Sequence, residues 1–443
     1  MNQSRRMPMW GWIALAGGCG LALVCLCVAV VGGGLFFLRP TIGVAPVPVE
    51  VVQLRPVNRI AYQGTDGNIY TVAPDGSDVK ALTTDCQSGE QAQRINRTPT
   101  WSPDGRQVAY VKVSLAAGGL QSSLHTAALE NGAIETLHTA NGSGPFYLYW
   151  APDSRQLAFL ESVGQNIALR LAQLGQPQSQ ELGQGSPFYY AWAPDSRRLL
   201  FHVDGVKPAP SARVSLFQPG QTEAPPLSSN PALFLAPDWS ADGKRLAYAR
   251  RAENNLDEVV VANADGSDPR SVVTYRGLVS FAWAPNSDQL AYIVTASPEA
   301  QGLGQIAFGP LAVTDPTGAN PRVLSQDDVL AFFWSPDGAS IATLTLYENP
   351  QTGETSLRWN VVDVASGDAH EVATFDPSEE FVSLIPFFDQ YARSLRVWSP
   401  DSRSLVYAVD EGQDQYGIYV VDVAPGSQPR RLADGVTAAW SWR

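Results

Sequence analysis

The chain has 443 residues, of which 44% are hydrophobic and 16% charged, and its formal net charge is −13. These values exclude an intrinsically disordered chain, and an acidic sequence without a Lys/Arg cluster excludes non-specific nucleic-acid binding. The 38 Gly and 33 Pro are spread along the sequence, which favours an all-β fold made of short strands and tight turns.

The N-terminal part predicts a membrane anchor. Residues 9–38 are almost wholly apolar and uncharged, longer than the roughly 20 residues that a spanning helix needs. Arg5 and Arg6 precede this run and only Arg39 closely follows it, so we expect residues 1–8 to be a short cytoplasmic tail. The predicted location is the cytoplasmic membrane of a bacterium, with a single span and the remaining chain on the outer face.

A cleaved signal peptide and a lipoprotein signal at Cys19 are the alternatives to this anchor. The apolar run is longer than the about 7–15 residues of a cleavable segment, and it continues past Cys19. Residues 39–57 contain four prolines and predict an extended spacer. Cys86 is the only cysteine beyond the apolar run, which excludes an intradomain disulfide framework and a thiolate metal site.

A tryptophan-led pentapeptide recurs along the rest of the chain. Its spacing varies from 42 residues (150 to 192) to 64 residues (334 to 398). The copies are WSPDG at Trp101, WAPDS at Trp150, WAPDS at Trp192, WSADG at Trp239, WAPNS at Trp283, WSPDG at Trp334 and WSPDS at Trp398. Ser-Pro-Asp-Gly is typical of a type I turn, and an apolar strand such as RQVAYV follows each copy. One repeat therefore predicts one four-stranded propeller blade.

The two ends of the repeat region are complementary. The segment from Asn58 lacks a tryptophan strand, while the chain finishes with such a strand at Trp440. Joining them in one blade would close the ring and remove free sheet edges. We therefore predict an eight-bladed β-propeller over residues 58–443, with seven blades as the nearest alternative.

These repeats resemble the TolB-type family of WD-like propellers, whose signature is a Trp-Ser-Pro-Asp-Gly turn followed by an Ile-Ala-Phe-like strand. The resemblance extends from Asn58 to Arg443, with Ala241 and Asn286 as departures from the turn pattern and an insertion after Trp334. It implies the fold more than the function. Similar propellers serve as interaction platforms, as gating domains of hydrolases and as carbohydrate-lyase scaffolds.

Motifs for catalysis are not found in the sequence. There is no G-x-S-x-G, and the four histidines, His125, His138, His202 and His370, lack metal-ligand spacing. The repeated aspartates of the turns, such as Asp104, are interpreted as acceptors of local backbone hydrogen bonds, and the repeat tryptophans as packing between blades. We expect no enzyme activity, no cofactor and no metal.

Two long loops are the candidate partner-binding regions, because binding residues concentrate in loops that exceed the structural minimum. They run from 84 to 99 and from 376 to 396. The first contains Arg94 and Arg97, and the second mixes arginine with aromatic residues, the types enriched at interfaces. The candidate residues are Arg94, Arg97, Phe381, Phe387, Phe388, Tyr391, Arg393 and Arg396. The alternative for the phenylalanines is packing onto blade edges.

The sequence thus predicts a non-catalytic scaffold that docks a protein or peptide on its loop face, or senses a ligand there. The alternative is a carbohydrate-binding protein, lyase or hydrolase with its site at the mouth of the central channel. A deep polar funnel would favour this alternative, whereas a filled channel with an apolar rim would favour the scaffold.

Overall fold

The computed structural model describes residues 57–86, 94–116, 119–142, 144–203, 212–218, 225–228, 230–232, 235–253, 256–295 and 307–443. The predicted membrane segment 9–38, the cytoplasmic tail and the spacer up to residue 56 lie outside these ranges. Within them, no helix is long and apolar enough to cross a membrane. The anchor and its orientation therefore remain predictions.

The described chain is almost entirely β-structure in antiparallel sheets. The sheet that contains both ends consists of β1 (Ile60–Gln63), β2 (Ile69–Val72), β3 (Lys80–Ala81) and β30 (Thr437–Trp440). The next consists of β4 (Arg94–Trp101), β5 (Gln107–Ala116), β6 (Gly119–Ala128) and β7 (Ile134–Asn141). It is followed by β8 (Pro145–Trp150), β9 (Gln156–Val163), β10 (Asn166–Gln173) and β11 (Gln180–Gly185).

Two further four-stranded sheets follow along the chain. The first consists of β12 (Phe188–Trp192), β13 (Leu199–Val203), β14 (Arg213–Phe217) and β15 (Pro226–Ser228). The second consists of β16 (Asp238–Trp239), β17 (Arg245–Arg251), β18 (Asp257–Asn263) and β19 (Arg270–Tyr275). In each sheet the order of strands in space is their order in sequence, as consecutive hairpins give.

A seven-stranded sheet comes next, because one long strand belongs to two repeats. It consists of β20 (Val279–Trp283), β21 (Leu290–Val294), β22 (Gly309–Thr314), β23 (Arg322–Trp334), β24 (Ser340–Glu348), β25 (Thr355–Asp363) and β26 (Ala369–Phe375). The first part of β23 pairs with β22 and its last part, from Val329, pairs with β24. The connection between these two repeats is therefore a continuous strand and not a loop.

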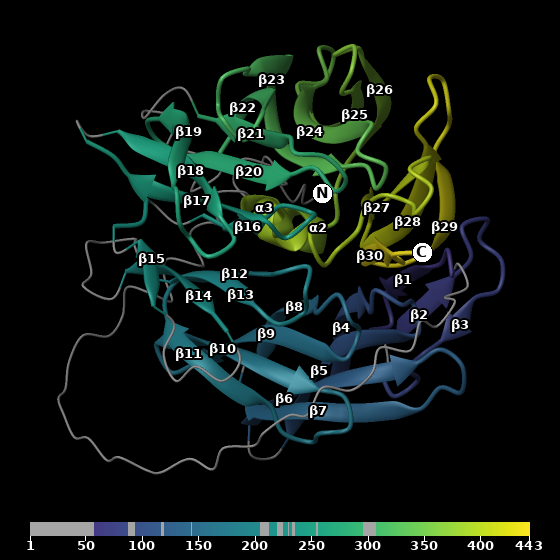
Figure 1. Cartoon of the computed structure of the whole chain (residues 1–443). Coiled ribbons are helices and arrows are strands. Elements are labelled where there is room, and N and C mark those ends of the chain that lie inside the picture. The colour runs from purple at the N-terminus through teal and green to yellow at the C-terminus, as the bar shows by residue number, and fades with distance from the viewer. Residues whose placement is uncertain are drawn as a thin grey trace, which may run out of the picture.

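The last repeat has three strands, β27 (Ser404–Gly412), β28 (Gln415–Asp422) and β29 (Arg430–Asp434). Trp398 makes an isolated bridge to Leu405 in the position of a fourth strand. The sheets surround a common centre in which α2 (Glu379–Leu384) and α3 (Phe388–Tyr391) lie, with the 3-10 turn η2 (Ile385–Phe387) between them (Figure 1). This radial arrangement is that of a β-propeller.

The first and last described strands pair with each other. Ile60 lies opposite Trp440 and Gln63 opposite Thr437 in an antiparallel register. Beyond the strands, the Val57 N–H donates to the backbone oxygen of Arg443 at 2.9 Å. This is the pairing that the complementary ends of the repeat region predict.

The repeat tryptophans connect neighbouring sheets. Five of their indole N–H groups donate, at 2.9–3.2 Å, to the carbonyl oxygen one residue before the tryptophan of the preceding repeat. The pairs are Trp101 with Ala439, Trp150 with Thr100, Trp192 with Tyr149, Trp334 with Ala282 and Trp398 with Phe333. The interpretation of these tryptophans as contacts between blades is therefore confirmed.

The turn residues have the local roles that the sequence indicates. The Asp104 carboxylate accepts from the Ser102 hydroxyl at 2.6 Å and from the Arg106 N–H at 3.0 Å. Where serine replaces the last glycine of the motif, it adopts a left-handed conformation, with φ 60° at Ser154. Its hydroxyl then accepts from the Asp104 N–H of the preceding turn at 2.9 Å, so this substitution connects one repeat to the next.

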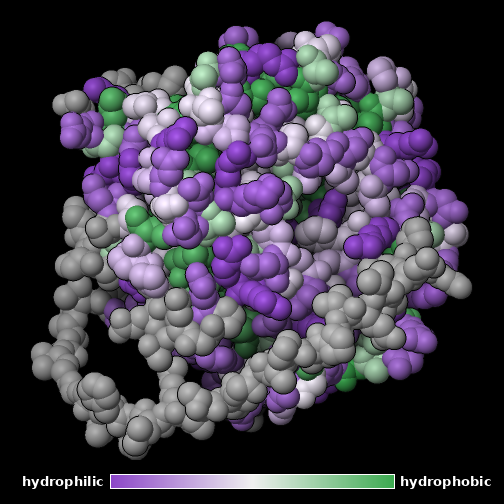
Figure 2. Space-filling model, viewed as in Figure 1, coloured by the Kyte–Doolittle hydropathy of each residue, from purple (hydrophilic) through white to green (hydrophobic). Residues whose placement is uncertain are grey.

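One face of the described molecule is predominantly polar. The face shown in Figure 2 is mostly hydrophilic, with hydrophobic residues in small separate areas. The hydrophobic residues are instead shared between sheets: Val111 and Leu124, for example, cluster with Trp150 and Leu157 of the next sheet. The core is therefore a series of interfaces between blades.

Candidate functional site

Residues 376–397, here called the central segment, run through the middle of the ring (Figure 1). The segment begins where Ser378 caps α2: its hydroxyl accepts from the Phe381 N–H at 3.2 Å and donates to the Val436 carbonyl at 2.6 Å. Glu379 and Glu380 occupy the first turn of α2, where negative charge is favourable. The segment leads to Trp398 and to the turn face, which we define as the face that carries the tryptophan turns.

Aromatic side chains of the central segment pack against strands of two repeats. The Phe388 ring lies 5.2 Å from that of Phe332, and the Phe381 ring 6.2 Å from that of Trp359. The Tyr391 ring makes an edge contact with Tyr147 at 5.0 Å. Phe388 and Tyr391 thus contact the first strands of two different repeats, whereas Phe381 packs farther out, against β25 and β26.

Polar groups fix the same segment. The Tyr147 hydroxyl donates to the Gln390 carbonyl at 3.0 Å, and the Tyr190 N–H donates to the Gln390 side-chain oxygen at 3.1 Å. The Asp389 carboxylate accepts from the Ala236 N–H at 3.2 Å. Burial raises the pKa of Asp389 to about 6, since its carboxylate lies in a poorly solvated site.

A buried ion pair joins the central segment to the ring. Asp238, at the start of β16, is 5% exposed, and its carboxylate pairs with the Arg393 guanidinium. The same carboxylate accepts from the backbone N–H groups of Trp239 at 2.7 Å and Trp283 at 2.8 Å. Burial raises the pKa of Asp238, and the charge of Arg393 opposes this shift. The indole N–H groups of Trp239 and Trp283 have no acceptor among the described residues, whereas their backbone N–H groups donate to Asp238.

A cavity of about 390 Å³ opens between the tryptophan turns, and we call it the turn-face pocket. Its lining is mainly aromatic and proline side chains, and its charged residues are Asp238, Arg393, Arg396 and Arg443. The aromatic and proline residues are Pro103, Tyr149, Trp150, Pro152, Trp192, Pro194, Trp239, Trp283, Pro285, Phe332, Phe333, Trp334, Pro336, Trp398 and Trp442. Its size is in the range of sites for small ligands or peptide side chains.

Arg396 and Arg443 line this pocket without an ion pair to a described carboxylate; of the two, Arg396 is half-buried and Arg443 is exposed. The Arg396 guanidinium lies over the Trp442 ring, 4.4 Å from the centroid, while its backbone carbonyl accepts from the Trp440 N–H at 2.8 Å. Desolvation lowers the pKa of Arg396 to about 10, which still leaves it charged at neutral pH. The pocket thus contains a desolvated positive charge next to an aromatic wall.

The structure distributes the sequence-predicted partner residues over several places. Arg393 and Arg396 line the turn-face pocket, whereas Phe388 is 4% exposed and packs in the core. In the central segment, Phe381, Phe387 and Tyr391 are half-buried. On β4, Arg97 is half-buried and interacts electrostatically with Tyr391, while Arg94 is exposed at the start of the strand. Their role in partner binding remains a prediction.

Sequence reasoning missed Asp238, although a signal for it exists. The residues that precede the other repeat tryptophans are all uncharged: Thr100, Tyr149, Ala191, Ala282, Phe333, Val397 and Ala439. An aspartate at this inward-facing position requires a buried cation. The sequence also did not indicate on which face the pocket lies. The two long loops lead into the first residues of the tryptophan strands, whereas the pocket lies at the turns that follow the tryptophans.

The four histidines have separate structural contacts. His125 lies within hydrogen-bond distance of Ser123 and Thr136, His202 contacts the Leu235 carbonyl at 3.0 Å and His370 the Val423 carbonyl at 2.6 Å. Across the described part of the chain, no group of three or more His, Cys, Asp or Glu side chains is arranged to hold a metal ion.

A serine, a histidine and a carboxylate do form a hydrogen-bonded chain on one interface between sheets. The Ser179 hydroxyl lies 2.9 Å from His138 Nδ1, and His138 Nε2 lies 3.1 Å from the Glu161 carboxylate. Arg170 also pairs with Glu161. Burial raises the pKa of the Glu161 carboxyl, but the contacts with His138 and Arg170 outweigh it, so the pKa of Glu161 is lowered. These three hydrogen-bonded side chains connect β7 to the sheet of β9 and β10, and none of them lines the turn-face pocket.

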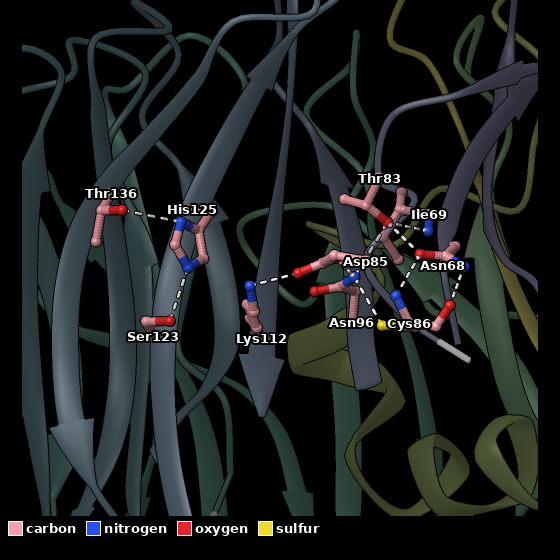
Figure 3. A network of polar contacts seen from close by, with 10 residues as sticks. All are labelled: Asn68, Ile69, Thr83, Asp85, Cys86, Asn96, Lys112, Ser123, His125 and Thr136. Atoms are coloured by element: carbon pink, nitrogen blue, oxygen red, sulfur yellow. Dashed lines mark hydrogen bonds and ion pairs between the residues drawn. The ribbon is translucent and has the colours of Figure 1, made fainter. Parts of the chain in front are cut away.

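Cys86 belongs to a buried polar network next to the closing sheet (Figure 3). The Asn96 side-chain NH₂ contacts the Cys86 sulfur, the Thr83 hydroxyl and the Asp85 carboxylate, each at 3.0 Å. Asn68 accepts from the Cys86 N–H at 3.1 Å. Burial raises the pKa of the Cys86 thiol, so this cysteine is a poor nucleophile and serves to hold the segment after β3.

Comparison with known proteins gives structural likeness alone. No protein-family model matches the sequence, and no curated protein matches it. TolB from Acinetobacter baumannii is 19% identical with a TM-score of 0.36, over 61% of this chain and 64% of TolB, so the match spans less than two thirds of that protein. A eukaryotic initiation factor is 14% identical with a TM-score of 0.49, over 86% and 98% of the two chains.

An oligogalacturonate lyase from Vibrio parahaemolyticus is also similar, at 11% identity and a TM-score of 0.46, over 85% of each chain. With TM-scores below 0.5, these likenesses decide neither the activity nor the partners of this chain. The assignment of a propeller rests on the order and register of its own sheets.

Proposed function

We propose that this chain is a membrane-tethered, extracytoplasmic β-propeller of eight blades that binds a protein or peptide partner in the turn-face pocket and has no catalytic activity. The count takes the two halves of the seven-stranded sheet as two blades and adds Trp398 to the sheet of β27–β29. The pairing of β1 with β30 supports a closed ring.

The observation that carries the binding function is that the central segment fills the channel and leaves one aromatic pocket with a desolvated arginine at the turn face. Tryptophan, tyrosine and arginine are the residue types that dominate interface hot spots. A guanidinium that is desolvated before binding loses little hydration when it meets a carboxylate, which favours an acidic peptide group.

The buried carboxylates at the centre support binding over catalysis. Asp238 is paired with Arg393, and Asp389 accepts backbone N–H groups, so both are committed to holding the central segment. A lyase or hydrolase site at the channel mouth would need carboxylates or histidines directed at a substrate. The turn-face pocket instead offers rings, prolines and positive charge.

The test uses the full-length chain in its native membrane with a photoreactive amino acid at Ala241, an exposed residue of the pocket rim. The control position is Glu354, which is exposed in the hairpin after β24 at the end opposite to the turn face. We expect a partner to be cross-linked from position 241 and not from 354, and R396Q to reduce this yield about tenfold or more. Equal cross-linking from both positions, or no effect of R396Q, would refute the proposed site.

The non-catalytic part of the proposal has its own test at Ser179, the serine of the hydrogen-bonded chain with His138 and Glu161. A fluorophosphonate probe labels serines that a histidine activates. We expect no labelling of Ser179 in the folded chain. Stoichiometric labelling that disappears in S179A would contradict the proposal and favour a hydrolase.

A further inference from the structure

The described chain begins at the rim of the turn-face pocket. The Val57 N–H donates to the backbone oxygen of Arg443, which lines the pocket, and the Val57 side chain packs in the same cluster as Trp442. Val57 also contacts Gly105 in the turn that follows Trp101 and Pro103. Val57, the first described residue, therefore lies beside the pocket.

The sequence that precedes residue 57 has the composition that this pocket fits. Residues 46–56 read PVPVEVVQLRP, with three prolines and five aliphatic residues. Proline-rich segments bind aromatic grooves at low entropic cost, because their extended conformation is favoured in advance. The pocket wall of tryptophan and proline side chains provides such a groove.

Charge complementarity points to one residue of this segment. Glu50 is the first acidic residue of the chain, and the next is Asp66. Arg396 is a desolvated cation whose neighbour in the pocket is the Trp442 ring, and no carboxylate of the described residues pairs with it. Six residues lie between Glu50 and Val57, and the seven steps from one to the other span at most about 23–25 Å.

We propose that residues 46–56 of this chain occupy the turn-face pocket in cis, with the Glu50 carboxylate on the Arg396 guanidinium, and so compete with the protein partner. This inference rests on the proposed binding role of the pocket and adds its regulation. A segment attached at the rim acts at an effective concentration in the millimolar range, so weak binding suffices for occupancy. A partner would displace the segment when its own affinity exceeds this intramolecular competition.

The test places a photoreactive amino acid at Val49 of the full-length chain in detergent, with cross-linked peptides mapped by mass spectrometry. We expect cross-links to pocket peptides that contain Trp150, Trp239 or Trp442. Mixing ¹⁵N-labelled and unlabelled chains separates cis from trans products, and all should be cis. E50Q should reduce the yield about tenfold, whereas E50D and the matched control Q53A should retain it.

The partner provides a second measurement. Cross-linking from Ala241 should increase in E50Q, since the competing segment is weakened. The inference is overturned if Val49 cross-links elsewhere, to a second copy or to nothing, or if E50Q behaves as Q53A does. If R396Q still reduces cross-linking of the partner from Ala241 while one of these results is found, only the occupancy of the pocket by residues 46–56 is refuted. If R396Q changes neither the cross-linking from Val49 nor that from Ala241, the proposed function is refuted as well.

Discussion

Replacing Asp238 with alanine should strongly destabilise the ring. The substitution leaves the buried Arg393 guanidinium without its carboxylate, and the N–H groups of Trp239 and Trp283 lose their acceptor. Removing one partner of a buried ion pair costs about 3–5 kcal/mol. For a protein of this size we expect the melting temperature to fall by on the order of 6–10 °C.

The assay is thermal unfolding of the full-length chain, followed by tryptophan fluorescence at neutral pH. The matched control is D288A, since Asp288 forms an exposed pair with Arg245 at 2.8 Å and its side chain is 59% exposed. Exposed pairs contribute about 0–1 kcal/mol, so this variant should melt within about 2 °C of wild type.

The melting temperature of D238N should lie between those of D238A and D288A, because an asparagine side chain keeps one acceptor oxygen but loses the charge. If D238A melts no lower than D288A, then Asp238 does not anchor the central segment, and the account of how this segment is held in the channel is wrong.

Three further predictions follow from buried groups. Burial raises the pKa of Asp389 from 3.8 to about 6, so the fold is more stable at acid pH, where this carboxyl is protonated. About 3 kcal/mol of the free energy of unfolding is lost as the pH rises from 4 through 6. Thermal unfolding at pH 4 and pH 7 should show that D389N lacks this pH-dependent part. Iodoacetamide should not modify Cys86 in the folded chain, because its thiol is 7% exposed and its pKa is raised; peptide mapping after unfolding should then detect full modification. Deleting residues 437–443 removes β30 and exposes the edge of β1, so the truncated chain should aggregate in size-exclusion chromatography where the full chain does not.

The repeat and its ends could be predicted from sequence because their signal is local. The turn of Trp-Ser-Pro-Asp-Gly contains its own hydrogen bonds, as Ser102 and Asp104 show, so the pentapeptide specifies its conformation wherever it occurs. The pairing of Ile60 with Trp440 followed from an incomplete repeat at each end. Neither inference required knowledge of distant contacts.

The central segment could not be placed from sequence, because its packing depends on contacts with strands of several repeats. Phe388 is as suitable for an interface with a partner as for the interior of a channel, and only the position of Phe332 decides between them. Phe381 packs instead on Trp359 and Phe375 of β25 and β26. A helix inside the ring also has no repeat of its own to compare with. Asp238 is the one contact of this segment that the sequence could have indicated, because it is a charged residue directly before a repeat tryptophan, where the other repeats have uncharged residues.

The most direct test of the account is hydrogen–deuterium exchange of the central segment in the full-length chain. The N–H groups of Ala392 and Leu395 donate to the carbonyls of Phe388 and Tyr391 at 2.7 and 2.8 Å inside the ring. Peptides that cover residues 385–397 should therefore exchange as slowly as those of β12. If they exchange within seconds, as exposed hairpin tips do, the channel is open and the assignment of a binding site at the turn face fails.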